Sequence, residues 1–165
     1  NGTIGLEILE DLPNVDTIIV PYGGGGLSTG IASAVKSIKP DTKIYACEVV
    51  TAAPLSASLV AGKPSSCHYT PSFVDGIGSK MVLPEMWNMV SNLIDDSLVV
   101  SVKQIADAVA LLIKSNCVVA EGAGAAPLAA ALNKLGSEGN IVCVVSGGNI
   151  DSGKLISILQ NEIPH

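Results

Sequence analysis

Aromatic residues are scarce in this chain, which contains one Trp, three Tyr and one Phe among its 165 residues. Hydrophobic residues nevertheless make up 48% of the sequence, so the core must be built from Val, Ile, Leu and Ala. Charged residues reach only 15%, which indicates a chain that buries much of itself. This composition is typical of a parallel sheet covered by helices on both faces, and we predict an α/β fold for one domain or part of a larger one.

Long apolar runs and basic clusters are also missing from the sequence. No hydrophobic stretch reaches the roughly 18 residues of a membrane span, and we expect no signal peptide. The net charge is −6, and a chain without a basic cluster is poorly suited to nucleic acid or anionic membranes. We therefore expect neither a membrane nor a nucleic-acid partner.

The four cysteines form no C-x-x-C pair, which argues against a structural zinc site. They are widely separated, at Cys47, Cys67, Cys117 and Cys143. Cys47 and Cys143 fall in predicted buried strands, where cysteine usually acts as a small hydrophobic residue. We expect all four to be reduced thiols in a cytoplasmic protein.

The most informative stretch is a run of four glycines, Gly23 to Gly26, between a predicted strand and a predicted helix. The β-branched run over 16–20 predicts the strand, and apolar residues at helical spacing predict a helix over 27–38. Glycines leave backbone amides bare, and a helix N-terminus adds unpaired N–H groups and a partial positive charge. The combination predicts a phosphate cradle, with a tight glycine turn without a ligand as the alternative.

The spacing of this run departs from two known nucleotide-binding patterns. The pattern G-x-G-x-x-G starting at Gly24 has Thr29 where its third glycine belongs. The pattern G-x-x-x-x-G-K-[ST] starting at Gly25 reaches Gly30 but continues with Ile31 instead of lysine. Without that lysine and a hydroxyl for magnesium, a triphosphate is disfavoured, and a single phosphate monoester fits better.

Further elements follow from periodicity and from turn residues. We predict helices over 3–12, 54–61, 83–94, 102–113, 125–135 and 152–160, and strands over 43–48, 97–100 and 140–145. The first strand, helix and second strand form a parallel strand–helix–strand unit. Residues 65–80 are expected to be an irregular connection, and long loops of this kind are often functional.

Several polar residues follow strands or precede helices. Ligands of open parallel sheets bind beyond the carboxyl ends of the strands, where we expect the glycine run, Glu48, Glu121 and the Ser146–Asn149 turn. Ser146 offers a hydroxyl for a ring nitrogen, or the turn simply joins a strand to a helix. Glu121 either approaches a cofactor or stabilises a helix N-terminus. Glu48 is a cation ligand, a ribose acceptor or a solvated carboxylate.

Five segments occur in an order that points to one family. They are Gly2-Thr3-Ile4, Val20-Pro21-x-Gly23-Gly24-Gly25-Gly26-Leu27, Asp75-Gly76-Ile77, Val119-Ala120-Glu121-Gly122-Ala123-Gly124-Ala125 and Ser146-Gly147-Gly148-Asn149-Ile150-Asp151. Together they resemble the threonine/serine dehydratases, fold-type II pyridoxal-phosphate enzymes that include serine racemase. The resemblance covers the whole chain and implies part of the large domain of a tryptophan synthase β-like fold.

The resemblance also implies a cofactor and its contacts. Pyridoxal 5'-phosphate would be held through the backbone amides of Gly23, Gly24, Gly25, Gly26 and Leu27. Ser146 would hydrogen-bond the pyridine nitrogen, with Gly147 beside it, while Gly76 and Glu121 would lie near the ring. A hydroxyl at that nitrogen leaves it unprotonated, which favours prompt loss of a β-hydroxyl over a long-lived carbanion.

The chain departs from the family pattern in two respects. Serine racemase relatives hold a divalent cation through a carboxylate matching Glu48, a carbonyl matching Ala52 and an aspartate at the position of Pro54. Glu48 and Ala52 are thus the candidate metal ligands, because proline has no ligating side chain. Family members are about twice as long, and their N-terminal half carries the substrate-carboxylate loop and a Schiff-base lysine in a Ser-Phe-Lys-x-Arg context. None of the nine lysines here lies in that context.

We therefore expect residues 1–165 to be the C-terminal, cofactor-phosphate-binding part of a dehydratase, without the N-terminal catalytic lysine and without a catalytic residue of its own. The full enzyme would convert L-threonine or L-serine to a 2-oxo acid and ammonia. The missing half or a homo-oligomer partner would complete the site. The alternatives are a serine racemase-type enzyme, a non-catalytic phosphate- or nucleotide-binding module, and a structural partner of a second polypeptide.

Overall fold

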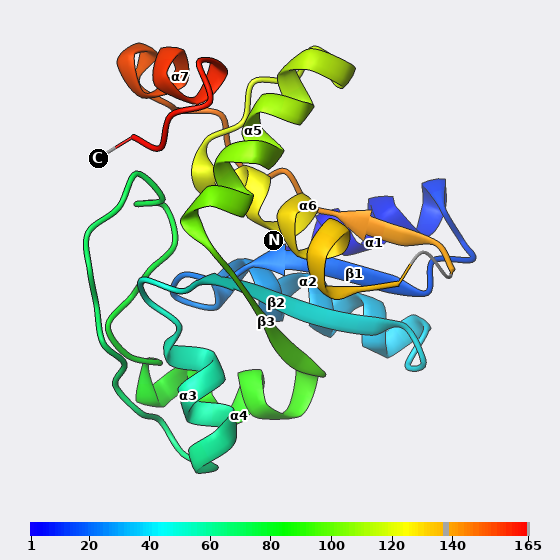
Figure 1. The fold of residues 1–165 in the computed structure, drawn as a ribbon. Helices are drawn as coiled ribbons and strands as arrows, with labels where there is room; N and C mark the ends of the chain where they lie inside the picture. The colour runs from blue at the N-terminus through cyan, green and yellow to red at the C-terminus, as the bar shows by residue number, and fades with distance from the viewer. Residues whose placement is uncertain (137–138, 165) are drawn as a thin grey trace.

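The computed structural model describes residues 1–136 and 139–164, in which helices and parallel strands alternate (Figure 1). In chain order the elements are α1 (Gly2–Asp11), β1 (Thr17–Pro21), α2 (Gly26–Ile38), β2 (Lys43–Val49), α3 (Pro54–Ala61), α4 (Pro84–Leu93), β3 (Asp96–Val100), α5 (Val102–Asn116), α6 (Gly122–Lys134), β4 (Ile141–Cys143) and α7 (Ser152–Leu159). Among the described residues, no helix is both long and apolar enough to cross a membrane.

The four strands found among the described residues form one parallel sheet in the order β3-β2-β1-β4. The register of β1 and β2 runs from Thr17 opposite Lys43 to Pro21 opposite Cys47, which confirms the predicted strand–helix–strand unit β1-α2-β2. Because all strands are parallel, their carboxyl ends meet at one edge of the sheet. The predicted α/β class is confirmed.

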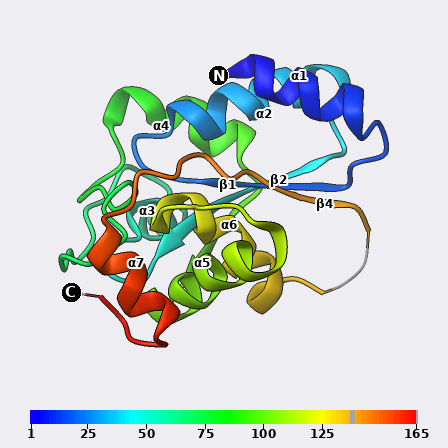
Figure 2. The ribbon, with the colours of Figure 1, turned by 90° about the horizontal axis from the view of Figure 1, so that it is seen from above.

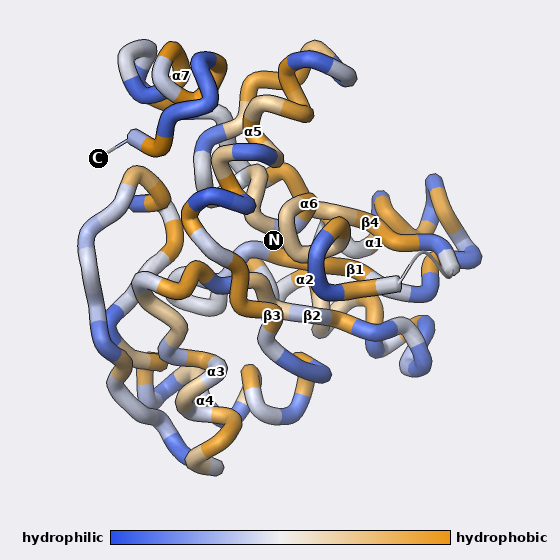
Figure 3. Tube along the Cα trace, viewed as in Figure 1, coloured by the Kyte–Doolittle hydropathy of each residue, from blue (hydrophilic) through white to orange (hydrophobic). Residues whose placement is uncertain are grey.

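Helices cover both faces of the sheet, as the sequence predicts (Figure 2). Side chains alternate along a strand, so Ile18 and Val20 of β1 pack in one core with α1, α2 and α4. Ile19 points to the opposite face and packs in a second core with α5, α6 and α7. Figure 3 shows that the hydrophobic residues gather along the strands and the helix faces beside them.

Local sequence signals explain where several helices begin. Helix α5 starts with a capping box, in which the Ser101 hydroxyl accepts from the Gln104 amide and the Gln104 side chain accepts from the Ser101 amide. Proline occupies the first turn of α3 and of α4, where its missing N–H costs nothing. Helix α6 begins at Gly122, earlier than predicted, because the Glu121 carbonyl already accepts from the Ala125 amide.

The last strand is shorter and more exposed than predicted. We predicted a buried strand over 140–145, but β4 ends at Cys143 and is half-buried, because it lies at an edge of the sheet. The Val144 amide still donates to the Ile19 carbonyl at 3.0 Å before the chain bends away. Cys47 in β2 is fully buried, as predicted, and burial raises the pKa of its thiol.

Asp95, directly before β3, ties three elements together. Its carboxylate accepts from the Ile44 amide at 2.8 Å and forms ion pairs with Lys36 of α2 at 2.8 Å and Lys43 of β2 at 3.1 Å. Partial burial by itself would raise the pKa of Asp95, but the Ile44 amide and the two ammonium groups hold it below its ordinary value. The folded state therefore favours the ionised carboxylate.

We expect Asp95→Asn to lower the free energy of unfolding by about 1 kcal/mol near neutral pH. A depressed folded-state pKa means that the stabilisation is present above the unfolded pKa and is lost as the pH falls through the folded value. The difference between wild type and variant should therefore shrink in acid, as measured by urea denaturation. Asp107→Asn, which breaks an exposed ion pair with Lys103, is the control and should show neither effect. A pH-independent difference would contradict the prediction.

Candidate functional site

A pocket of about 200 Å³ opens at the carboxyl edge of the sheet, where β1 ends and α2 begins. It is lined by Pro21, Gly23, Gly24, Gly25, Gly26, Leu27, Gly76, Ile77, Glu121, Ala123 and Ser146. The structure thus brings the predicted cofactor residues from four separate segments to one place. Gly147, the remaining predicted residue, does not line the pocket but lies against Glu121.

The backbone of the glycine loop is held in a left-handed conformation at Gly25, whose φ is 89°. Its carbonyl oxygen turns towards the start of α2 and accepts from three donors. These are the Thr29 amide at 2.9 Å, the Thr29 hydroxyl at 2.7 Å and the Ser28 hydroxyl at 3.1 Å. Both side chains are buried, so the Gly25 carbonyl is fixed inside the fold.

A second carbonyl of the loop is also held, because Gly23 accepts from the Ser79 hydroxyl at 3.2 Å. The amides of residues 23–27, by contrast, donate to no acceptor in the part of the chain that the structure describes. They lie at the N-terminus of α2, where the helix dipole favours an anion. The sequence predicts this cradle but misses Ser28, Thr29 and Ser79. The signal for the first two is a pair of hydroxyl residues in the first turn after a glycine run.

Glu121 directs its carboxylate into the space between two glycines. A Cβ atom on Gly147 would lie 2.5 Å from Glu121 Oε1, and one on Gly76 would lie 3.2 Å from the same atom. Glu121 is the N-cap residue of α6, yet its side chain makes no capping hydrogen bond. The Glu121 side chain therefore lines the pocket at the N-terminus of α6 and makes no capping hydrogen bond.

The turn after β4 packs tightly against α6. The Glu121 amide donates to the Gly147 carbonyl at 3.0 Å, and a Cβ on Gly124 would collide with that same carbonyl oxygen. Gly124 is thus required for backbone-to-backbone contact between two segments that form one wall of the pocket. The exposed Ser146 lies directly before Gly147 and reaches the pocket from this turn.

Tyr22 lies beneath the glycine loop and is 2% exposed. Its hydroxyl oxygen lies 3.3 Å from where a Gly25 Cβ would be, and it has no hydrogen-bond partner among the described residues. Burial and the nearby Glu48 charge raise the pKa of Tyr22 to about 12. The phenol is therefore neutral near neutral pH and serves as a floor for the loop.

Glu48 is 1% exposed, so the solvated carboxylate that was one expectation for it is wrong. One oxygen accepts from the Leu55 amide at 2.8 Å, and the other accepts from the Ser56 amide at 2.8 Å and the Ser97 hydroxyl at 2.6 Å. Burial raises the pKa of the Glu48 carboxyl, and these donors only partly offset the effect. A side chain enclosed in this way is not presented at the surface for a ribose.

The proposed cation site is not a cluster of ligands. Ala52 is buried near Glu48 in sequence, but the described residues contain no group of three or more His, Cys, Asp or Glu side chains that could hold a metal ion. Neither Glu48 nor Ala52 lines the pocket at the glycine loop. The structure therefore separates the candidate metal ligands from the candidate cofactor residues.

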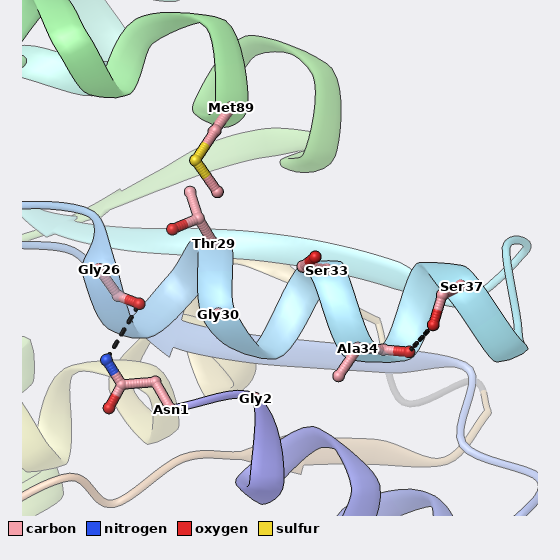
Figure 4. A pocket seen from close by; sticks show the side chains of 9 residues that line it. All are labelled: Asn1, Gly2, Gly26, Thr29, Gly30, Ser33, Ala34, Ser37 and Met89. Atoms are coloured by element: carbon pink, nitrogen blue, oxygen red, sulfur yellow. Dashed lines mark hydrogen bonds between the residues drawn. The ribbon is translucent and has the colours of Figure 1, made fainter.

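A larger groove of about 600 Å³ runs along the other side of α2 (Figure 4). Its lining residues are Asn1, Gly2, Gly26, Thr29, Gly30, Ser33, Ala34, Ser37 and Met89. The Asn1 side-chain amide donates to the Gly26 carbonyl at 3.1 Å at one end of the groove. The lining side chains are small or neutral, so this groove lacks the carboxylate that the smaller pocket contains.

The fold and the pocket agree with a match to one protein family. Residues 1–147 match the family described as pyridoxal-phosphate dependent enzyme, and the chain belongs to this family. The family implies pyridoxal phosphate as the cofactor. The glycine loop, with its amides free of protein acceptors, fits the phosphate of such a group.

Relatives within the family are threonine ammonia-lyases and related enzymes, which confirms the resemblance to the dehydratases. The L-threonine ammonia-lyase of Thermotoga maritima is 41% identical over 160 residues, which are 96% of this chain and 40% of the relative. Maize serine racemase has a TM-score of 0.87 at 38% identity, covering 96% of this chain and 50% of that one. The processed threonine deaminase isoform 2 of Solanum lycopersicum has a TM-score of 0.89 at 32% identity, covering 97% of this chain and 48% of that one. The chain thus spans half the length of these relatives or less.

We expect Gly124→Ala to lower the free energy of unfolding by about 1–3 kcal/mol, because the new methyl group meets a backbone oxygen that cannot move alone. Gly24→Ala is the matched control, since a Cβ at this position of the loop has no neighbour within 4 Å. Urea denaturation of both variants measures the difference. Equal stabilities would contradict the close packing of α6 against the turn after β4.

Proposed function

We propose that this chain supplies the pyridoxal 5'-phosphate-binding surface of an enzyme that eliminates water from L-threonine or L-serine and releases a 2-oxo acid and ammonia. The observation that carries the proposal is the pocket at the glycine loop. It combines backbone amides without protein acceptors, the Ser146 hydroxyl and the Glu121 carboxylate. The names of the relatives support this reaction class.

The phosphate is assigned to the amides of Gly23, Gly24, Gly25, Gly26 and Leu27. An anion at this position gains from several N–H donors and from the dipole of α2. No lysine lines the pocket in the described residues, so the backbone provides the positive end of the interaction. This is the arrangement expected for one phosphate monoester.

The ring is assigned to the space bounded by Ser146, Glu121 and Gly76. When bound, pyridoxal phosphate withdraws electrons from the substrate carbon next to the amino group. The neutral Ser146 hydroxyl would donate one hydrogen bond to the unprotonated pyridine nitrogen without supplying a charge. Gly76 leaves room beside the ring, and Gly147 leaves room for the Glu121 carboxylate.

The lysine that forms the covalent link to the cofactor must come from outside residues 1–165. The lysines of this chain lie outside the pocket lining that the structure describes. We propose that an N-terminal half or a partner chain provides this lysine and the contacts to the amino-acid substrate. The four free cysteines support a cytoplasmic location.

A racemase-type activity on serine is the second candidate, and the similarity to maize serine racemase is compatible with it. Both reactions begin with loss of the same proton, and the pocket described here serves either one. The two are separated by the products of the complete enzyme from L-serine. A dehydratase forms a 2-oxo acid, whereas a racemase forms D-serine.

We expect the purified chain to retain pyridoxal 5'-phosphate in equilibrium dialysis, with inorganic phosphate competing and adenosine monophosphate competing poorly. Thr29→Val keeps the side-chain shape but removes the hydroxyl from the Gly25 carbonyl, and should weaken retention about fivefold, as one hydrogen bond of about 1 kcal/mol implies.

The matched control for Thr29→Val is Ser37→Ala. The Ser37 hydroxyl also donates to a backbone carbonyl of α2, that of Ala34, but it lies away from the glycine loop. This variant should leave retention unchanged. Equal retention by the two variants would contradict the role of Thr29. Failure of the wild-type chain to retain the cofactor would contradict the phosphate site itself.

We expect the purified chain to form no 2-oxo acid from L-threonine, even with saturating pyridoxal 5'-phosphate, because the base and the covalent link are missing. A coupled assay with lactate dehydrogenase and NADH measures 2-oxo acid formation. Addition of a lysine-bearing chain that restores the pocket should restore the activity. Turnover by the purified chain alone would overturn the assignment of the lysine to another segment.

A further inference from the structure

Helix α3 begins with an unusual arrangement of donors. Its first residue, Pro54, has no backbone N–H, so the first amides that need an acceptor are those of Leu55 and Ser56. Both donate to the Glu48 carboxylate, one to each oxygen, at 2.8 Å. The negative charge thus lies at the positive end of the helix dipole, where it is stabilised.

A third donor reaches the same carboxylate from a different strand. The Ser97 hydroxyl of β3 donates to the oxygen that also accepts from Ser56, at 2.6 Å. A single side chain of β2 therefore joins β2, α3 and β3, and it is 1% exposed. These three hydrogen bonds partly offset the cost of burying the carboxylate.

A divalent cation would need the same oxygens. Calcium takes six to eight oxygen ligands, and magnesium takes six, of which one or two are carboxylates and several are waters. Three of the roughly four acceptor sites of the Glu48 carboxylate are already directed at donor hydrogens. The position that would supply a second carboxylate is Pro54, and no cluster of ligating side chains exists among the described residues.

We propose that Glu48 caps α3 in place of a divalent cation, so that this chain holds the β2–α3–β3 junction together without a metal ion. The residues present do not fit the cation that the family resemblance implies for this position. This inference does not rest on the proposed enzymatic activity, because it concerns how the fold is held together.

The junction lies under the loop that carries Gly76. The Thr51 carbonyl, between β2 and α3, accepts from the Thr70 amide at 2.9 Å, and the Ala52 methyl lies against Gly78. The segment between β2 and α3, directly before the capped turn, therefore contacts the loop that forms one side of the pocket. In this chain the junction is held by hydrogen bonds instead of ion coordination.

The first test is the melting temperature of the wild-type chain in EDTA and in millimolar magnesium, calcium or manganese chloride. We expect the same value in all four conditions, because the described residues contain no cluster of side chains that would hold these ions. A rise of about 3 °C or more with any of them would show specific binding to the folded state and overturn the proposal.

The second test locates the effect at Glu48. Glu48→Gln places an amide N–H₂ group against one of the three donors, and should lower the melting temperature by about 5 °C or more, equally in EDTA and in magnesium chloride. A decrease that is present with the cation and disappears in EDTA would show that Glu48 is a cation ligand. Ser97→Ala removes one donor and provides the same comparison if Glu48→Gln does not fold.

Glu85→Gln is the matched control for both variants. Glu85 lies in the first turn of α4, which also begins with proline, and its side chain is exposed. We expect its melting temperature to stay within about 1 °C of wild type in both conditions. A loss in Glu85→Gln equal to that in Glu48→Gln would overturn the specific role of the buried carboxylate.

Discussion

The carbonyl oxygen of Gly25 is the atom on which the geometry of the pocket depends. Ser28 and Thr29 hold it inside the fold through three hydrogen bonds, and this fixes the direction of the neighbouring peptide groups. The Gly23 and Gly25 carbonyls are engaged by the protein, whereas the loop amides have no acceptor among the described residues. Because these hydrogen bonds already fix the loop conformation, a ligand would not have to order the loop on binding. This lowers the entropic cost of binding.

The opposite wall of the pocket depends on close approach between backbones. Glu121 and Gly147 are joined by an amide-to-carbonyl bond, and Gly124 lets the two segments meet without a side chain between them. After β4 ends at Cys143, the chain turns and reaches α6 through this contact. The position of the Glu121 carboxylate is therefore a result of packing between α6 and the turn after β4.

Most of the fold was predictable from local signals. The β-branched run before Gly23, the proline at the start of α4 and the helical periodicity after Val102 each identify their element, because one short segment determines the conformation. The site residues were found through glycine motifs and family resemblance. These residues lie at one edge of the sheet because the carboxyl ends of parallel strands meet there. This location can be predicted without knowing any side-chain contact.

The roles that were not predicted belong to residues whose hydrogen-bond partners are distant in the sequence or are backbone groups. Glu48 looks like a solvated carboxylate because its donors on α3 and β3 lie 7 to 49 residues further along the chain. Thr29 looks like an ordinary helical residue until the Gly25 carbonyl is seen beside it. The half-buried state of β4 depends on its place in the strand order, which periodicity does not reveal.

The short length of β4 has a consequence for association. An edge strand exposes backbone groups that pair with strands of other molecules, and a long flat edge is a template for aggregation. Three residues of β4 pair with β1, and the chain then bends towards α6. The β4 edge therefore offers only a brief stretch for strand addition.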